Sequence, residues 1–238
     1  MSEVRGDSEL QSEILEDLRE ATNWRAWLCD LVRPHLGDDP LEIGSGVGDY
    51  GHELAAALPR FTVSEADPRR LALLRTRFAD HPRVGVRELM APIIETGEHS
   101  AVVSFNVLEH ISDDVGALAS FAGLVRPGGR VVVVTPACQA AMSRFDREVG
   151  HVRRYSARSL RASAVAAGLD VVEIRHLNAP GLLAWFVMMK LLRGRPTAGA
   201  PLRFWDGRMI PLIRRLESRV PAPFGQTLFL VARVPAHA

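Results

Sequence analysis

The sequence has little cysteine and no excess of charge of either sign. Its 238 residues include two cysteines, Cys29 and Cys138, which lie far apart and lack the paired spacing of a zinc site. We therefore expect reduced thiols, as in a cytoplasmic protein, and no bound metal. The formal net charge of +1 gives no reason to expect nucleic acid as a partner.

Long hydrophobic runs are also missing. The N-terminus is acidic and polar, unlike a signal or transit peptide. Apolar residues nevertheless make up 47% of the chain, enough for one sizeable core. We expect a polar tail or marginal amphipathic helix at 1–22 and a single domain at 23–238.

An apolar stretch near the C-terminal end allows three interpretations. Within residues 181–195 its uninterrupted part, Leu182 to Met189, is far shorter than the ~20 residues of a transmembrane helix. The stretch is expected to cover a pocket, to form the face of a homodimer, or to make weak contact with a membrane surface.

Residues 41–51, LEIGSGVGDYG, predict a strand, a tight turn and the start of a helix. A short apolar run ends in Gly44, Gly46 and Gly48. Glycines allow a positive φ and the close approach of a ligand, and the free N–H groups of a helix start favour an anionic or polar group. The stretch predicts a site for a nucleotide-like cofactor, although a plain packing turn has the same pattern.

An acidic residue stands where the next strand is expected to end. The apolar run at Phe61 and Val63 leads to Glu65, about 20 residues after Gly44, a spacing at which an acid accepts hydrogen bonds from ribose hydroxyls. We predict that Glu65 binds the ribose, with Ala66 beside it.

The glycine turn differs from those that bind dinucleotides or phosphates. It lacks the third glycine of the dinucleotide fingerprint, and Glu42 stands two residues before Gly44. No Lys-Ser/Thr pair follows, which excludes a Walker-type loop. Instead, the residues resemble the first motif of the class I S-adenosylmethionine-dependent methyltransferases, with an acid, GxGxG and a ribose-binding acid. The resemblance implies S-adenosyl-L-methionine as cofactor, with Glu42 under its positively charged methionine part.

The same resemblance implies further cofactor contacts. A helix at 23–36 would place Trp24 and Arg25 near the methionine end, unless its tryptophans only pack on the sheet. Many relatives have an aspartate for the adenine at the end of the third strand, where this chain has Leu89 and Met90. We expect Met90 to offer the adenine an apolar surface.

The segment 100–110, SAVVSFNVLEH, predicts a buried parallel strand with polar residues at its end. Such strand ends face the ligand crevice of an open sheet, so Asn106 and Leu108 are expected to contact the cofactor. The string NVLEHI also resembles the fourth-strand motif of the same family. His110 is a candidate general base, or a residue that orders the following loop.

Residues 145–155, FDREVGHVRRY, lack apolar periodicity and follow the fifth expected strand. Similar FDxxxGHxRRY strings occur in a bacterial, type 11/12-like subfamily of these methyltransferases, often found beside glycosyltransferases and in natural-product pathways. We predict His151 as base or acceptor orienter, Asp146 as its partner, and Tyr155 in the lining of the site.

Two arginines in this segment leave a further choice open. Arg153 and Arg154 offer bidentate guanidinium groups for a carboxylate or phosphate of the acceptor. Alternatively, they join Asp146 in an internal network that shapes a lid.

The alternation of strands and helices from 41 to 135 predicts an α/β fold with a doubly wound parallel sheet. The resemblance adds a Rossmann-like sheet of seven strands, mostly parallel, whose last strand at 227–234 is antiparallel and lies between the fifth and sixth. It also implies a cofactor-binding core at 38–136 and acceptor-side segments at 137–238.

The function implied is methyl transfer to a small-molecule, natural-product or glycan-type acceptor. Two alternatives remain at this point: a non-catalytic relative that binds the cofactor or a partner protein, and a nicotinamide reductase, which Glu42 argues against. The acceptor atom and a possible homodimer are left open.

Overall fold

The structure is a computed structural model that describes residues 8–91, 93–191, 194 and 198–236. The predictions for residues 1–7, and for the last residues of 181–195 other than 194, lie outside this part of the chain.

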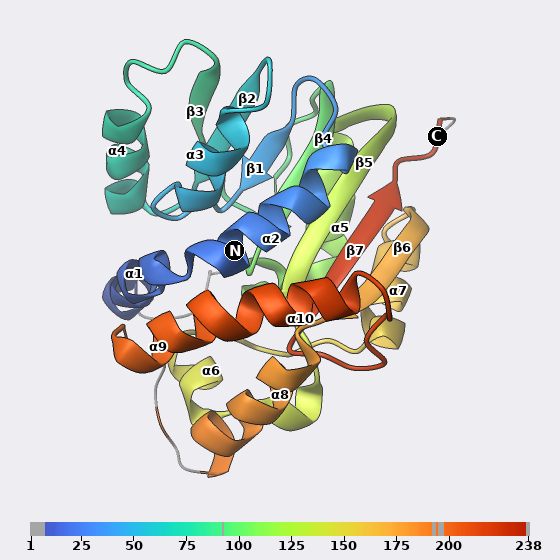
Figure 1. Ribbon diagram of the computed structural model, residues 1–238. Coiled ribbons are helices and arrows are strands. Elements are labelled where there is room, and N and C mark those ends of the chain that lie inside the picture. Colours follow the sequence, from blue (N-terminus) through green and yellow to red (C-terminus); the bar gives the residue numbers. More distant parts are fainter. Residues whose placement is uncertain (1–7, 92, 192–193, 195–197, 237–238) are drawn as a thin grey trace.

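A single sheet organises the described residues. Its seven strands lie in the order β3-β2-β1-β4-β5-β7-β6 (Figure 1). They are β1 (Leu41–Ile43), β2 (Phe61–Glu65), β3 (Val84–Glu88), β4 (His99–Phe105), β5 (Val125–Pro136), β6 (Asp170–Leu177) and β7 (Thr227–Arg233). Strand β7 is antiparallel to both neighbours, β5 and β6, while the other pairs are parallel. The predicted fold class and the insertion of the last strand are confirmed.

Strand β5 begins earlier than the sequence suggests. Adjacent glycines such as Gly128 and Gly129 ordinarily indicate a turn that precedes a strand. In the structure Val125 already pairs with His99, and the backbone of Gly128 and Gly129 exchanges hydrogen bonds with Val234. The pairing with β4 and the end of β7 therefore extends β5 through the glycines.

Helices cover both faces of the sheet. They are α1 (Ser8–Asp17), α2 (Thr22–Val32), α3 (Asp49–Ala55), α4 (Pro68–Arg77), α5 (Asp114–Gly123), α6 (Arg144–Glu148), α7 (Ala157–Ala166), α8 (Ala179–Trp185), α9 (Ala200–Phe204) and α10 (Ile210–Glu217). One core layer joins α2, α3, α4 and α10 to the sheet, and the other joins α5 and α7 to its opposite face. The central strands β1, β2 and β4 are accordingly buried along almost their whole length, as parallel strands with helices on both faces are.

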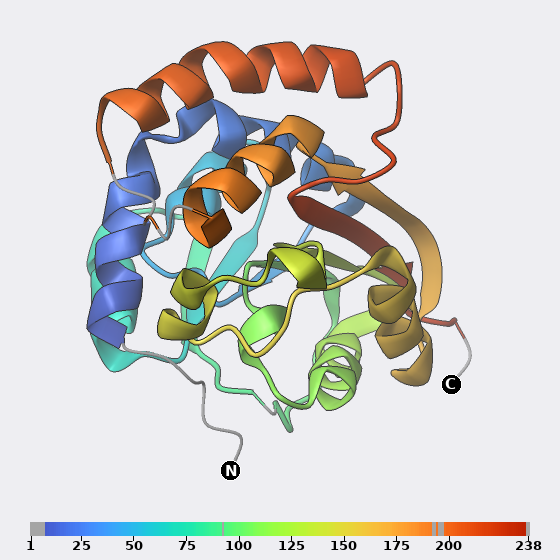
Figure 2. The same ribbon diagram turned by 90° about the horizontal axis from the view of Figure 1, so that it is seen from below.

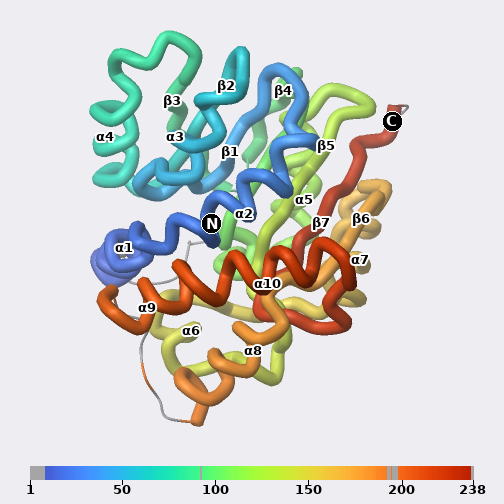
Figure 3. Tube along the Cα trace, viewed as in Figure 1, coloured from blue at the N-terminus to red at the C-terminus, as the bar shows by residue number. Residues whose placement is uncertain are grey.

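The carboxyl edge of the parallel strands is covered by additional segments. Figures 1 and 2 show α1, α6 and α8 gathered below this edge, and the tube in Figure 3 shows α9 and α10 joined in one long helical path. The π-helical turn η6 (Trp205–Met209) connects α9 to α10, and η6 and α10 both contact α2. The segments that follow the strands are therefore enclosed by chain from both termini.

The apolar stretch after β6 forms α8 and the π-helical η5 (Phe186–Leu191). Met189 is buried, whereas the side chains on the outer face are exposed: Leu183, Phe186, Val187, Met188 and Leu191. Of the helices in the described ranges, none has the length and apolar character needed to span a bilayer.

Candidate functional site

The glycine turn lies between β1 and α3, at the carboxyl edge of the sheet. Gly44, Gly46 and Gly48 have φ values of 68°, 56° and 82°. A Cβ on Gly44 would lie 2.6 Å from Cγ2 of Val107, which follows β4. The left-handed backbone and this close approach both require glycine, so packing against the end of β4 fixes the shape of the turn.

Helix α1 lies over the turn. A Cβ on Gly46 would lie 3.0 Å from Cδ1 of Leu15. One turn earlier in α1, the Nε2 of Gln11 donates to the backbone oxygen of Val149, 2.9 Å away. The N-terminal segment therefore forms a helix that connects the glycine turn with the end of α6.

Glu65, the predicted ribose ligand, stands at the end of β2 and is only 5% exposed. Its carboxylate accepts hydrogen bonds from the backbone N–H groups of Gly46 (2.9 Å), Ala66 (3.0 Å) and Asp67 (3.0 Å), and from Nη2 of Arg70 (3.3 Å). Glu65 therefore holds the glycine turn to the end of β2. The ribose contacts of Glu65 and Ala66 stay predictions. They are compatible with the geometry, because the Glu65 carboxylate has several lone pairs and lies beside the glycine turn.

Glu42 is buried below the turn, with 1% of its surface exposed. Its pKa is raised to about 8, mainly by burial. The hydrogen bond from Ser45 lowers this pKa, and the charges of Glu65 and Asp49 raise it. The Ser45 hydroxyl donates to Oε2 at 2.9 Å. At neutral pH the carboxyl is protonated, and a positive group bound nearby would favour its ionised form. The site thus suits the cationic part of a ligand.

Trp24 and Arg25 lie at the start of α2. The Trp24 ring meets Trp27 edge-on, with centroids 5.3 Å apart, and joins the core. Arg25 reaches α3, with Nε 3.4 Å from Glu53 and Nη1 4.0 Å from Asp49. Arg25 is therefore beside the helix that follows the glycine turn, while Trp24 serves the packing that the sequence left as an alternative.

Three further predicted cofactor contacts lie at strand ends. Met90, after β3, is 59% exposed, whereas Leu89 is buried. Asn106 follows β4 in a left-handed conformation with a φ of 53° and is exposed. The side chain of Leu108 is fully buried in the core, so only its backbone can meet a ligand.

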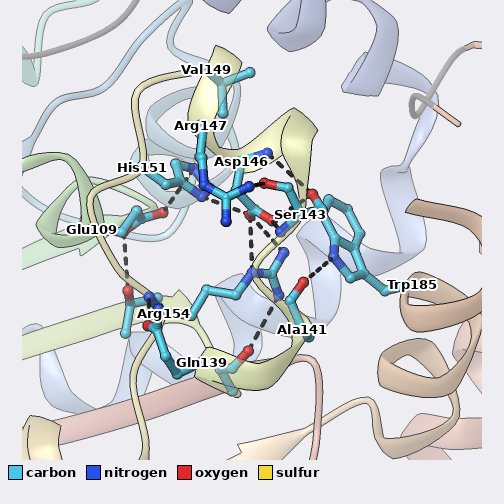
Figure 4. Close-up of polar contacts among 12 residues, drawn as sticks. Glu109, Gln139, Ala141, Ser143, Asp146, Arg147, Val149, His151, Arg154 and Trp185 are labelled. Atoms are coloured by element: carbon cyan, nitrogen blue, oxygen red, sulfur yellow. Dashed lines mark hydrogen bonds and ion pairs between the residues drawn. The ribbon is translucent and has the colours of Figure 1, made fainter. Parts of the chain in front are cut away.

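His151 and Asp146 form a pair in the segment that follows β5 (Figure 4). Nδ1 of His151 lies 2.9 Å from Oδ1 of Asp146, which is fully buried. Asp146 also accepts bonds from Ser143 and from Arg154, whose Nε and Nη2 lie 2.9 and 2.8 Å away. Burial alone would raise the pKa of Asp146, but the hydrogen bond with His151 and the charge of Arg154 outweigh it and hold that pKa well below its usual range. The ionised carboxylate makes Nδ1 the donor and leaves Nε2 for other contacts.

Nε2 of His151 faces Glu109, which follows β4. Glu109 is fully buried, and its Oε2 accepts a 3.0 Å hydrogen bond from the Thr135 hydroxyl. Its Oε1 is 3.8 Å from Nε2 of His151, and the ring of His110 meets that of His151 edge-on at 4.7 Å. His110 and His151, predicted separately, are thus brought together. Glu109 was not among the predicted site residues, although the same strand-end string, NVLEHI, contains it.

Arg153, Arg154 and Tyr155 are engaged within the protein. Arg153 binds Asp114 at 2.8 Å, and the hydroxyl of buried Tyr155 donates to the same carboxylate at 2.9 Å. The guanidinium of Arg154, bound to Asp146, lies 4.5 Å over the ring of Trp185. Tyr155 therefore faces α5 and not the histidines. Of the internal network that the sequence left as an alternative, Arg154 joins Asp146, whereas Arg153 pairs with Asp114 instead.

An open hollow of about 490 Å³ lies beside this network. Two of the charged groups that line it, Arg153 and Asp114, are paired with each other. The lining of the hollow therefore includes an ion pair.

Comparison with known proteins gives a family and several relatives. The family model described as "Methyltransferase domain" matches residues 14–174. An uncharacterized methyltransferase of Mycobacterium tuberculosis is 38% identical over 109 residues, which are 45% of this chain and 55% of that protein. A probable S-adenosylmethionine-dependent methyltransferase of Mycolicibacterium smegmatis is 31% identical over 146 residues, 59% of this chain and 55% of that protein. The chain spans about half the length of the curated relatives it matches.

Solved structures with similar folds cover most of the chain. A putative methyltransferase from Bacillus halodurans has a TM-score of 0.61 at 12% identity and covers 87% of this chain and 97% of its own. A structure described as the complex of the Haloferax volcanii Trm112 methyltransferase activator with a putative methyltransferase has a TM-score of 0.65 at 16% identity, with coverage of 98% and 100%. The TM-scores show a common fold, and at these identities the similarity shows the fold alone.

Proposed function

Because the chain belongs to the methyltransferase domain family, we propose that it transfers the methyl group of S-adenosylmethionine to a hydroxyl group of a small molecule of natural-product or glycan type. The resemblance found in the sequence is confirmed at the level of the family. When bound, the cofactor supplies an electrophilic methyl group on a sulfonium sulfur. One observation carries the proposal: Glu42 and Glu65, at the ends of β1 and β2, share a sheet edge with the His151–Asp146 pair that follows β5.

The cofactor side is assigned to the glycine turn and the two acids around it. Glu65 accepts hydrogen bonds from the ribose hydroxyls while it keeps Gly46 in place. Glu42 lies under the positively charged methionine part, whose charge lowers the pKa of this buried carboxyl. Arg25 and Met90 flank these groups at α2 and after β3.

The acceptor side is assigned to the histidines. A hydroxyl acceptor has to lose a proton, whereas an amine can bind in its neutral form, so a positioned base favours a hydroxyl. Asp146 holds His151 through Nδ1, which directs Nε2 at the acceptor side. His110 stands at the ring edge of His151 and limits its rotation.

Relatives support an acceptor of small size. A ubiquinone biosynthesis O-methyltransferase of Aromatoleum aromaticum is 30% identical over 105 residues, 42% of this chain and 44% of that protein. A demethylmenaquinone methyltransferase of Tropheryma whipplei is 26% identical over 121 residues, 50% of each chain. Both are named for reactions on small molecules, and the balanced charge of this chain gives no support to a nucleic-acid acceptor.

Helix α8 is assigned to the cover of the acceptor side. The indole N–H of Trp185 donates to the oxygen of Ala141 at 3.2 Å, and the Trp185 ring lies against Arg154. These contacts fix α8 over the segment that contains Asp146. The exposed outer face of η5 is left for a homodimer or for weak contact with a membrane surface.

Calorimetric titration with S-adenosylhomocysteine and, in parallel, with NADH tests the cofactor. Binding of the first alone in the micromolar range supports the proposal. If neither S-adenosylhomocysteine nor NADH binds, the non-catalytic alternative is favoured. The adenine site would then be lost, because this chain has Leu89 and Met90 where many relatives have an adenine-binding aspartate.

Turnover of a labelled methyl donor with a panel of phenols, sugars and amines tests the acceptor side. His151→Ala should keep the affinity for S-adenosylhomocysteine and slow turnover by ~10²–10⁴-fold, the usual contribution of a positioned base. His52→Ala, at an exposed histidine on α3, is the control. Full activity of the His151 variant would return this segment to a structural role.

A further inference from the structure

Three side chains with metal-binding atoms meet on the acceptor side. Glu109 and His110 follow β4, and His151 follows α6 (Figure 4 labels Glu109 and His151). One ligand atom from each lies within 4.8 Å of the other two. Two imidazoles and a carboxylate form a ligand set that protein zinc sites use.

The contact between Glu109 and His151 is unsatisfied as it stands. Nδ1 of His151 donates to Asp146, so Nε2 presents its lone pair toward Oε1 of Glu109. Oε1 belongs to a fully buried side chain and has no hydrogen-bond partner. Two electron-rich atoms at a largely buried contact, where 11% of the His151 side chain is exposed, repel each other unless a cation or a proton lies between them.

The distance distinguishes a cation from a hydrogen bond. Oε1 of Glu109 and Nε2 of His151 are 3.8 Å apart. An N–H···O hydrogen bond spans ~2.7–3.2 Å, so this pair is too far apart for one. Two ligands that each lie about 2.1 Å from one ion are roughly 3.0–3.6 Å apart, so a small rotation of either side chain completes the geometry.

We propose that Glu109, His110 and His151 bind a divalent transition-metal ion such as Zn²⁺, with Asp146 as the positioning residue behind His151. A ligating histidine ordinarily donates its second N–H to a carboxylate, as His151 does to Asp146. Imidazole ligands select such an ion over Mg²⁺ and Ca²⁺, which prefer oxygen. The sequence predicted no bound metal because its cysteines lack the spacing of a zinc site. That criterion does not detect histidines that only the fold brings together.

The role of the ion rests on the proposed function, whereas its binding does not. Three protein ligands leave a coordination position open, as in catalytic sites. An acceptor hydroxyl bound there has its pKa lowered by the ion. Its O–H bond breaks and the proton passes to water. The oxygen electron pair forms the bond to the methyl carbon, while the bond from that carbon to the sulfonium sulfur breaks and its electron pair stays on the sulfur, which leaves as a neutral thioether. His151 then acts as a ligand of the ion.

The experiment uses the full chain, stripped with a chelator and titrated with ZnCl₂ by calorimetry and with CoCl₂ by visible absorption. We expect one tightly bound equivalent and a Co²⁺ ligand-field spectrum typical of nitrogen and oxygen ligands. Glu109→Gln and His151→Asn should each weaken Zn²⁺ binding by ~100-fold or more, beyond the 10–100-fold cost of losing an outer partner. His52→Asn should bind as the wild type does.

Thermal unfolding monitored by circular dichroism shows whether each variant is folded. If Glu109→Gln does not fold, the Zn²⁺ affinity of His151→Asn tests the proposal. Equal Zn²⁺ affinity in the wild type and the folded variants would overturn the proposal. Titration with S-adenosylhomocysteine separates the proposed methyltransferase function from the proposed metal site. Zn²⁺ binding without S-adenosylhomocysteine binding refutes the function alone, and the reverse result refutes the metal site alone.

Discussion

Three buried carboxylates, Glu42, Glu65 and Glu109, stand at the ends of β1, β2 and β4, and each is held in a different way. Glu42 has one hydroxyl donor and a raised pKa. Glu65 is surrounded by N–H donors. Glu109 has one oxygen bound to Thr135 and the other directed at His151. The three residues are of one type, so the different roles proposed for them follow from their different hydrogen-bond partners.

Glu65→Gln should weaken binding of S-adenosylhomocysteine by ~10-fold or more and lower the free energy of unfolding by ~1–3 kcal/mol. The amide of glutamine would direct N–H groups at the backbone donors that the carboxylate now satisfies. Calorimetry and urea unfolding measure the two effects. Glu88→Gln is the matched control, since Glu88 is exposed and pairs with Glu65 in the sheet register. Unchanged affinity would remove the ribose assignment.

Glu42 should make the stability of the ligand-free protein depend on pH. Its pKa is about 8 in the folded chain, against an ordinary value of 4.5. Between these values the unfolded chain holds one proton fewer at this group, so the free energy of unfolding falls as pH rises, by up to ~1.4 kcal/mol per pH unit. This part of the stability is complete below the ordinary pKa and is lost as the pH passes through the folded one.

Urea unfolding of the wild type and Glu42→Gln measures this contribution at several pH values. The wild type should lose stability relative to the variant as pH rises from about 5.5 to about 8. The comparison cancels the other groups that titrate, and Glu88→Gln should follow the wild type. A constant difference between wild type and Glu42→Gln would contradict the raised pKa.

At the scale of elements, α2 depends on a residue from the other end of the chain. Asp206, in η6, is 3% exposed and accepts from the backbone N–H groups of Asn23 and Trp24 at 2.9 Å each. It also accepts from Nδ2 of Asn23 at 3.1 Å. These are the orphan donors of the first turn of α2, for which no side chain of the helix's own N-terminus provides a cap.

Asp206→Ala should therefore lower the free energy of unfolding by ~1–3 kcal/mol, because it removes a buried cap and leaves backbone donors unpaired. Thermal and urea unfolding measure the loss. Glu20→Gln, in an exposed pair with Arg203, is the control and should change stability by no more than ~1 kcal/mol. Equal effects of the two substitutions would show that η6 does not support α2 in solution.

At the scale of the whole molecule, β7 completes the sheet from outside the span of the family model, which ends at residue 174. It lies between β5 and β6, and its residues Leu228, Phe229, Leu230 and Val231 are fully buried. Without it β5 would have an unpaired edge and both core layers would lose side chains.

A fragment of residues 1–174 should consequently show no cooperative thermal transition, although it contains the whole glycine turn, His110 and His151. Circular dichroism and solubility measure the outcome. A chain that ends at residue 235 keeps β7 and should unfold like the full chain. Cooperative unfolding of the shorter fragment would show that the sheet is stable without its inserted strand.

The sequence by itself determined the order of the elements, the glycine turn and the family, because apolar periodicity and glycine spacing are local properties of the chain. It also brought His151 and Asp146 together correctly, since they are close in sequence and lie in one short segment. Only the tertiary structure decided which residues meet across the sheet edge. It joined Glu109 and His110 to His151 and directed Tyr155 to Asp114. It also placed Leu15 over Gly46 and Asp206 at the start of α2. These contacts join segments that are distant in the chain, and the packing of helices against the sheet sets them, which no local pattern encodes.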